Sequence, residues 1–233
     1  MEFCRFLINQ MSDELNRVST HNEYSTLDYT GMSTLESYRK YKNNILEREN
    51  STIKDLFFFN LSNKSKCNLC NDITISYTEY LDLPLPLEFG GKDEITLEDL
   101  ISNFFKNKII EKKCEQCKKN VKANQITKLC ELNNQIIIFN ILREGNNKNI
   151  KINRYLDLNQ YLDDDLNNNK NMSYKYRVFA LINHDGNEEK GHYYSYINID
   201  NDFYQFNDLT VKKEIASDLL DNNHSYIIYY EKI

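Results

Sequence analysis

The sequence predicts an α+β fold, with helices early in the chain and a sheet late in it. Three observations support this prediction: apolar residues at helical spacing near the N-terminus, a capped helical segment near the middle, and several alternating, β-rich runs in the second half. The chain has 233 residues, 40% of them hydrophobic, so it can bury a substantial core and fits one large domain or two small ones.

The first element expected is an amphipathic helix at the N-terminus. Its apolar side chains recur at intervals of three and four, which predicts that they pack on a core; they are Phe3, Leu7, Met11, Leu15 and Val18. No capping residue precedes Glu2, so we interpret this helix as part of a domain entered partway. Residues 19–50 are polar and aperiodic, and indicate surface loop or a short helix.

The second helix expected begins at Thr96. Asp99 follows Thr96 by three residues and forms a capping pair with it. The apolar residues behind the cap predict about three helical turns; they are Leu97, Leu100, Ile101, Phe104 and Phe105.

Strands are predicted where apolar and polar residues alternate. Ile73, Ile75 and Tyr77 alternate with polar residues, and the segment 81–86 reads as an extended edge because it contains two prolines. Further strands are expected at 135–142, 176–183, 192–199, 203–206 and 226–230. Short connections favour antiparallel pairing for most of them.

Four of the six cysteines form two pairs with identical spacing, Cys67 with Cys70 and Cys114 with Cys117. Two such pairs match a closed tetrahedral site for a structural Zn²⁺ ion. An iron–sulfur cluster, a redox pair and four unrelated cysteines are the alternatives. Zinc is favoured because both pairs share one spacing, whereas a redox motif needs only one pair. Cys4 and Cys130 are predicted to be small buried hydrophobic residues.

A histidine and an asparagine lie at the ends of two neighbouring predicted strands. His192 begins the run 192–199, and Asn207 and Asp208 follow the run 203–206. In a cysteine hydrolase an imidazole takes the thiol proton, and a side-chain oxygen holds the other ring nitrogen. His192 is therefore a candidate general base whose function depends on a cysteine that can reach it.

Composition and charge limit the classes of binding partner and the cellular compartment that we expect for this protein. The net charge of −6 argues against nucleic acid as the main partner. No apolar run approaches the roughly 20 residues of a membrane-spanning helix. The N-terminus lacks the pattern of a secretory signal, so we expect an intracellular protein of the cytoplasm or nucleus, with cysteines as thiols or metal ligands.

Taken in order along the chain, these motifs resemble the ubiquitin-specific protease family of cysteine deubiquitinases. Glu2-Phe3 resembles the start of the family's Gln-Glu-Phe helix, the cysteine pairs resemble its zinc-bearing fingers, and the segment 80–85 follows the first pair as it does in the family. The segment 136–143 resembles a strand that usually ends in Lys-Arg-Phe, with departures at Leu142 and Glu144. The segments that match best are 176–186, 191–193, 206–211 and 225–230.

The resemblance implies a papain-like fold of fingers, palm and thumb, and a role for individual residues. His192 matches the catalytic base, Asn207 the residue that orients it, and Asp208 an assisting acid. Ubiquitin-binding positions are implied at Glu2, Gly191, Tyr193 and His184. Gly191 is interpreted as a position where a substrate backbone approaches the base, because glycine has no Cβ.

The family's nucleophile lies in a Gly-Asn-Thr-Cys-Tyr type box ahead of the first helix, and this sequence contains no such box. We therefore expect one N-terminally truncated domain over 1–233, with residual thumb and palm helices at 1–66, zinc-binding fingers at 67–120 and palm at 121–233. Truncation of a longer enzyme, a decayed inactive relative and a nucleophile on a separate chain are the three interpretations. Truncation is favoured because His192 and Asn207 are both intact.

The function implied is thiol-dependent hydrolysis after the C-terminal glycine of ubiquitin, with this chain inactive alone. The alternative is a zinc-stabilised ubiquitin-binding module without catalysis. A zinc-ribbon nucleic-acid binder is disfavoured by the acidic charge and by the lack of a basic aromatic patch.

Overall fold

The structure is a computed structural model that describes residues 1–19, 26–87, 94–132, 134–143, 145, 148–167, 174–186, 190–214, 220–222 and 224–233. Its helices are α1 (Glu2–Glu14), α2 (Thr34–Leu46), α3 (Thr52–Phe57) and α4 (Leu97–Phe105), with a short 3-10 helix at Asn159–Tyr161. None of the helices in the described residues combines the length and the apolar composition needed to cross a membrane.

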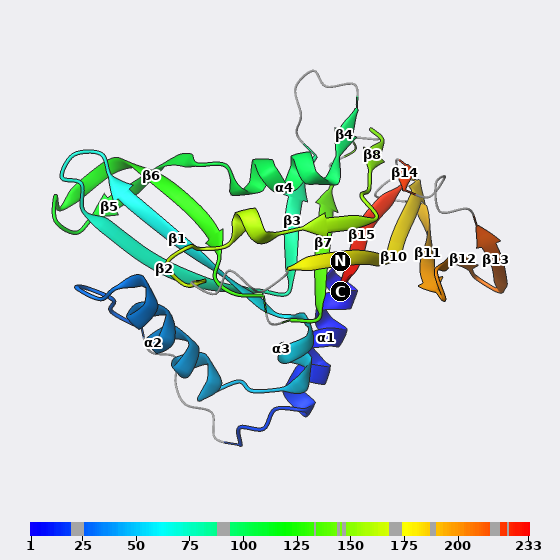
Figure 1. Ribbon diagram of the computed structural model, residues 1–233, viewed down its shortest axis with the longest axis horizontal. Helices are drawn as coiled ribbons and strands as arrows, with labels where there is room; N and C mark the ends of the chain where they lie inside the picture. Colours follow the sequence, from blue (N-terminus) through cyan, green and yellow to red (C-terminus); the bar gives the residue numbers. More distant parts are fainter. Residues whose placement is uncertain are drawn as a thin grey trace.

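An antiparallel sheet of four strands projects from the rest of the molecule as an arm (Figure 1). We call it the arm sheet. In spatial order it consists of β2 (Ile73–Tyr80), β1 (Phe59–Cys67), β6 (Lys119–Leu129) and β5 (Lys108–Cys114). The arm sheet therefore begins before residue 67 and ends after residue 120.

The second sheet, which we call the main sheet, has eight strands. Seven follow the order β13 (Thr210–Glu214), β12 (Asp202–Asn207), β11 (Gly191–Ile199), β10 (Lys175–Gly186), β15 (Ser225–Lys232), β7 (Ile136–Leu142) and β3 (Asp82–Pro86). The eighth, β9 (Tyr155–Asp157), pairs with β10. The β3–β7 pair is parallel and the other pairs of this sheet are antiparallel, as the short connections predicted for most strands. A small third sheet joins β14 (Asp221–Asn222), β8 (Ile150–Lys151) and β4 (Ile95–Thr96).

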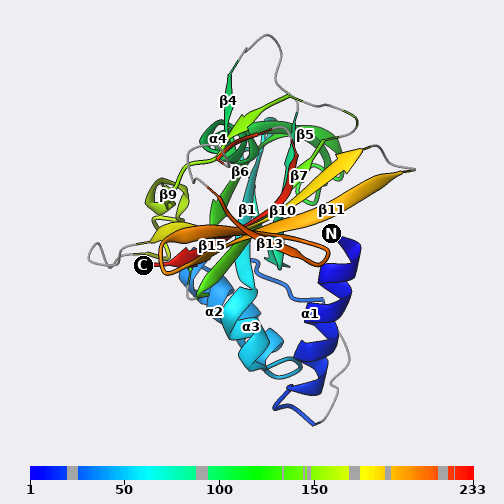
Figure 2. The same ribbon diagram turned by 90° about the vertical axis from the view of Figure 1, so that its right-hand side faces the viewer.

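The main sheet is covered on both faces. Successive residues of its strands alternate between the faces, so Phe139 and Ile228 belong to the large core that includes α4, whereas Ile138 and Ile227 belong to a second cluster. Residues of α1 and of the α3 region pack on this second cluster. In both views α1, α2 and α3 lie together on one side of the sheets (Figures 1 and 2). The predicted α+β class is confirmed.

The N-terminal helix is confirmed, but the face predicted to pack on the core is wrong. Phe3, Leu7, Met11 and Leu15 are exposed, and Val18 lies beyond the end of α1. Met1, Cys4 and Ile8 pack on the second cluster instead. The side chain of Arg5 binds both carboxylate oxygens of the buried Asp82 at 2.6 and 2.7 Å, and this pair holds α1 in its observed rotation. Because α1 has apolar residues on two faces, periodicity alone did not identify the buried one.

The segment 19–50 contains more structure than predicted. Ser33 and Glu36 form a capping box at the start of α2, a helix of 13 residues. The Ser-x-x-Glu signal for this helix was present in the sequence and was missed. The capping pair Thr96 and Asp99 was predicted correctly and begins α4. Glu144, one of the two departures noted near β7, lies outside the described residues.

Candidate active site and metal centre

The two cysteine pairs occupy the two β-turns at the tip of the arm sheet, one between β1 and β2 and the other between β5 and β6. Both turns have the same backbone geometry. The residue after the second cysteine has a positive φ, 61° at Asn71 and 54° at Lys118. In each turn this residue donates its N–H to the carbonyl oxygen of the first cysteine, at 3.0 and 2.8 Å. Identical spacing in the sequence therefore gives two equivalent cysteine turns.

The four sulfur atoms, of Cys67, Cys70, Cys114 and Cys117, lie within 4.8 Å of one another. Each turn faces the other, with Cys67 Sγ 3.9 Å from Cys117 Sγ and Cys70 Sγ 3.6 Å from Cys114 Sγ. A tetrahedral ion with metal–sulfur bonds of about 2.3 Å requires sulfur–sulfur distances of about 3.8 Å. The cluster therefore has the size and the donor set of a metal site.

The electrostatics of the cluster favour early ionisation of one thiol. The backbone N–H groups of Cys70 and Leu69 point at the Cys67 sulfur and lower the pKa of this thiol to about 6. The neighbouring Cys70 sulfur raises the pKa of Cys117 to about 12. Four thiolates this close repel one another unless a cation lies between them.

His192 and Asn207 lie together on adjacent strands of the main sheet. His192 is the second residue of β11 and Asn207 the last residue of β12. The register, with Ser195 opposite Phe206, puts both side chains on the same face. His192 Nε2 lies 2.6 Å from Asn207 Oδ1, and the imidazole stacks on the ring of Tyr194 at 6.3 Å.

The Asn207 contact determines which imidazole nitrogen can act as a base. With the amide oxygen as acceptor, Nε2 carries the proton, and Nδ1 keeps its lone pair. Asp208 Oδ2 lies 3.9 Å from Nε2, at the turn that follows β12. The His192 side chain is 48% exposed, so its free nitrogen is accessible to a group from outside the sheet.

His184, Tyr193 and Gly191 form a packed unit beside this pair. His184 is opposite Tyr193 in the β10–β11 register, on the face of the sheet that does not carry His192. Its buried ring lies 4.3 Å from the ring of Tyr193 and 5.3 Å from that of Tyr226. A Cβ on Gly191 would lie 1.8 Å from His184 Nε2. The position that a Gly191 Cβ would take is therefore filled by this imidazole, which is a structural reason for glycine here, while the residue itself stays exposed.

No thiol contacts the candidate base in the described part of the chain, where the hydrogen-bonding, ionic and ring contacts of the His192 imidazole are with Asn207, Asp208 and Tyr194. Cys4 is half-buried in α1 against the second cluster. Cys130 is fully buried beside Tyr38 and Tyr77, and burial raises the pKa of its thiol. The expectation of a small buried hydrophobic residue is confirmed for Cys130.

The fold and the site together define a class, a protein of mixed sheet and helix in which a side-chain amide contacts an exposed histidine at the ends of two adjacent strands. A family model described as ubiquitin carboxyl-terminal hydrolase matches residues 1–230. The chain belongs to the ubiquitin carboxyl-terminal hydrolase family, as its motifs predicted.

Relatives with known names support this assignment. Ubiquitin carboxyl-terminal hydrolase 2 of Bos taurus is 26% identical over 248 residues, which cover 99% of this chain and 39% of that protein. Ubiquitin carboxyl-terminal hydrolase 21 of Mus musculus is 25% identical over 198 residues, which cover 80% of this chain and 34% of that protein. The chain thus spans well under half the length of these curated relatives.

Solved structures show the same fold. A structure of the yeast SAGA DUBm with a mutant Sgf73 matches with a TM-score of 0.72 at 18% identity, over 100% of this chain and 50% of that one. The SAGA DUB module of Ubp8, Sgf11, Sus1 and Sgf73 bound to monoubiquitin matches with a TM-score of 0.64 at 20% identity, over 85% of this chain and 48% of that one. The predicted papain-like fold of this protease family is confirmed by these matches.

Proposed function

We propose that this chain is the part of a thiol-dependent ubiquitin hydrolase that carries the general base. The observation that carries the proposal is the His192–Asn207 contact of 2.6 Å, which leaves imidazole Nδ1 as the basic nitrogen. In this role Nδ1 takes the proton of a cysteine thiol and later returns it to the leaving amine, while Asn207 keeps the ring oriented. Asp208, 3.9 Å from Nε2, stabilises the imidazolium that forms between these steps.

The nucleophile in this proposal comes from a polypeptide segment outside these 233 residues. The outer face of α1 supports this, because its large apolar side chains are uncovered, with Phe3 74% and Phe6 61% exposed. Leu7 and Met11 extend the same exposed face. A run of apolar side chains on one helix face marks a surface that another element covers. We propose that the missing thumb packs there.

Ubiquitin is the proposed substrate and partner. Tyr193 and Gly191 are exposed beside the candidate base, and Glu2 is exposed at the start of α1. These three residues are the proposed contacts for ubiquitin. His184 is buried, so its proposed contribution is to support the ring of Tyr193 rather than to touch ubiquitin.

The cysteine cluster is proposed to hold a structural zinc ion. Four cysteines at closed-site distances leave no open position for a substrate. The ion would join the β1–β2 and β5–β6 turns and keep the arm sheet extended. Within this scheme 1–66 holds the thumb and palm helices, 67–120 the zinc-binding fingers and 121–233 the palm, with the strands of the arm sheet extending the fingers to Phe59 on one side and to Leu129 on the other. An intracellular, reducing location suits the free state of all six cysteines.

The test is incubation of this chain with ubiquitin that carries a cysteine-reactive group at its C-terminus, read by intact mass. We expect no adduct, because no thiol contacts His192 among the described residues. In parallel, ¹⁵N-labelled ubiquitin is titrated with the chain, and we expect shifts of its C-terminal glycine signals. Ubiquitin without these two glycines is the control. A His192-dependent adduct on Cys4 or Cys130 would show a displaced nucleophile and contradict the proposal, as would an unchanged ubiquitin tail.

The outer face of α1 is tested by substitution. Phe3→Ser with Phe6→Ser should change the free energy of unfolding of this chain by less than about 1 kcal/mol, since exposed side chains contribute little. Ile8→Ser, on the packed face, should cost about 2–3 kcal/mol. Urea unfolding measures both. Equal losses would mean that the outer face is already covered and that no further element packs on it.

A ubiquitin-binding module without catalysis is the second candidate. It is favoured by the lack of a thiol at His192 in the described residues. The two candidates differ in what Asn207→Ala does. Ubiquitin binding should stay unchanged in both. Once a nucleophile-bearing segment is supplied, the enzyme should turn over ubiquitin substrates and lose this activity with Asn207→Ala, whereas the binding module should show no turnover at all.

A further inference from the structure

Strand β2 has one free edge. It lies at the end of the arm sheet, whose order is β2-β1-β6-β5, and pairs only with β1 among the described strands. A free edge presents unpaired N–H and C=O groups, which makes it a template for a further strand.

The register identifies the backbone groups that point outward. Cys67 N–H donates to the Asp72 carbonyl oxygen, so these two residues form a hydrogen-bonded pair. Along an antiparallel ladder every second pair of opposite residues is hydrogen-bonded, so the bonded pairs can be counted from this one. Thr74, Ser76 and Thr78 then direct their backbone groups towards β1. The other side of β1 gives the same alternation. The Asn60 carbonyl oxygen accepts from Cys130 N–H on the side of β6, so Asn60 does not bond to Glu79, its opposite residue in β2. The outward groups therefore belong to the alternate residues Ile73, Ile75, Tyr77 and Glu79.

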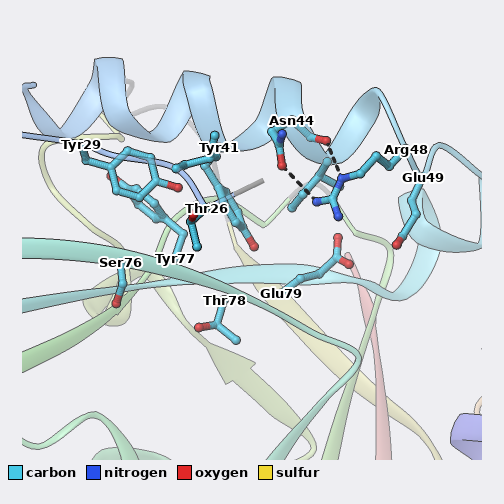
Figure 3. Close-up of a pocket in the computed structure, with 12 residues that line it drawn as sticks. Thr26, Tyr29, Tyr41, Asn44, Arg48, Glu49, Ser76, Tyr77, Thr78 and Glu79 are labelled. Atoms are coloured by element: carbon cyan, nitrogen blue, oxygen red, sulfur yellow. Dashed lines mark hydrogen bonds between the residues drawn. The ribbon is translucent and has the colours of Figure 1, made fainter. Parts of the chain in front are cut away.

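A groove follows this edge. Its larger part, of about 550 Å³, lies between α2 and β2, and Figure 3 shows Tyr41 and Arg48 extending from the helix towards the strand that carries Tyr77 and Glu79. Its smaller part, of about 340 Å³, lies between the segment 27–32 and the start of β2. Leu27 and Tyr29 line both parts, so the groove runs past most of the strand.

The groove is acidic and contains aromatic rings. Five carboxylates and one guanidinium line it: Asp28, Glu49, Asp72, Glu79, Glu115 and Arg48. Lys54 contacts both Glu49 and Glu79 from outside the lining, and Arg48 is held by Asn44, so the lining keeps a net negative charge. The ring of Tyr77 lies between those of Tyr29 and Tyr41, at 5.6 and 5.2 Å. Carboxylates and aromatic faces together favour lysine and arginine side chains.

We propose that the free edge of β2 is a docking site for an extended, lysine- or arginine-containing segment of a partner protein, which adds to the arm sheet as a fifth strand. The outward backbone groups supply the main-chain hydrogen bonds, and the acidic groove receives the cationic side chains. The site is remote from His192 in sequence and element, and it does not depend on the proposed hydrolase activity. It would give a protein of this kind a means of selecting the polypeptide that it engages.

The test uses the full chain and a short peptide of alternating lysine and valine. Amide hydrogen exchange is followed by NMR with and without the peptide. We expect exchange at the outward amides of Ile73, Ile75, Tyr77 and Glu79 to slow by about tenfold or more where the peptide pairs with them, since only this set gains an acceptor. The amides of Thr74, Ser76 and Thr78, already bonded to β1, should not change. Slowing at both sets alike, or at neither, would overturn the proposal.

Two control peptides separate strand pairing from simple attraction of charge. One replaces each lysine with glutamate, and the other keeps the lysines but has a central proline, which removes a donor and disfavours strand addition. Both should bind at least about tenfold more weakly by fluorescence anisotropy. Equal binding of the proline peptide would show that the peptide is held by non-specific electrostatic attraction, and would contradict the proposed strand pairing.

A matched pair of protein variants completes the test. Glu79→Gln removes a carboxylate of the groove and should weaken binding of the lysine peptide by about fivefold. Glu111→Gln removes an exposed carboxylate of β5, at the opposite edge of the same sheet, and should leave binding unchanged. Equal effects of the two variants would show that the peptide does not occupy the β2 groove.

Discussion

The cysteine cluster and the His192 site differ in where their parts come from. Two turns of one sheet supply all four sulfur atoms, which approach one another to within 4.8 Å without help from another element. The His192 site also takes its two main residues from neighbouring strands, yet no thiol contacts the imidazole in the described residues. The cysteine cluster, built from local turns, is complete within one sheet, whereas the proposed hydrolytic site needs a nucleophile from another part of a domain.

The largest effect is expected from loss of the proposed zinc ion. With a strong chelator, or with Cys70→Ser, the arm sheet should lose on the order of 5 kcal/mol, because binding free energy at a structural zinc site is also folding free energy. Metal content by atomic absorption and thermal unfolding by circular dichroism measure this. Cys4→Ser is the control and should keep one bound zinc. Full stability without metal would show that the cysteine cluster does not stabilise the arm sheet through a metal ion. The contrast with the His192 site would then be lost.

The next effect concerns the attachment of α1 to the main sheet. Arg5→Ala leaves the Asp82 carboxylate, whose side chain is 2% exposed, without its partner. Loss of one partner from a fully buried pair costs about 3–5 kcal/mol, and the partial exposure of Arg5 reduces the expected cost to about 2 kcal/mol. The control is Arg17→Ala, whose partner Asp55 is exposed, with an expected cost below about 1 kcal/mol. Similar costs in urea unfolding would mean that Arg5 does not hold the helix.

A smaller effect is expected at Gly191. The methyl group of Gly191→Ala would collide with the ring of His184, at a cost of about 1–3 kcal/mol. In a His184→Ala background the same substitution should cost less than about 0.5 kcal/mol, since the obstructing ring is gone. The double-mutant cycle is measured by urea unfolding. Additive costs would mean that Gly191 is required for a reason other than this contact.

The smallest effect on stability, but the most specific for the candidate base His192, is expected from Asn207→Ala. It should change the free energy of unfolding by less than about 1 kcal/mol, because the contact with His192 is partly exposed. The Nε2-protonated tautomer of His192 should lose its preference, as read from the ¹⁵N shifts of the ring. Leu209→Ala, at a fully exposed position of the same turn, should leave the tautomer unchanged. An unchanged tautomer in Asn207→Ala would show that the amide does not orient the base.

Signals that depend on a few neighbouring residues were read correctly from the sequence. The Thr96–Asp99 cap, the alternation in β2 and the spacing within each cysteine pair are of this kind. The Ser33–Glu36 cap was equally local, and without it the segment 19–50 was predicted as surface loop or a short helix. The buried face of α1 could not be predicted from neighbouring residues. Arg5 and Asp82 are far apart in the sequence, and their pairing determines the rotation of the helix.

The sequence by itself determined the α+β class, the family and the residues of the cysteine cluster and of the His192–Asn207 pair, because motif spacing and hydrophobic alternation are properties of short segments. Tertiary structure decided the contacts between segments. It placed the His184 ring in the space beside Gly191, left the apolar side chains of Phe3 and Phe6 uncovered, and opened an acidic groove along the free edge of β2. The physical reason is that burial and contact depend on which distant surfaces meet, and no local pattern encodes that choice alone.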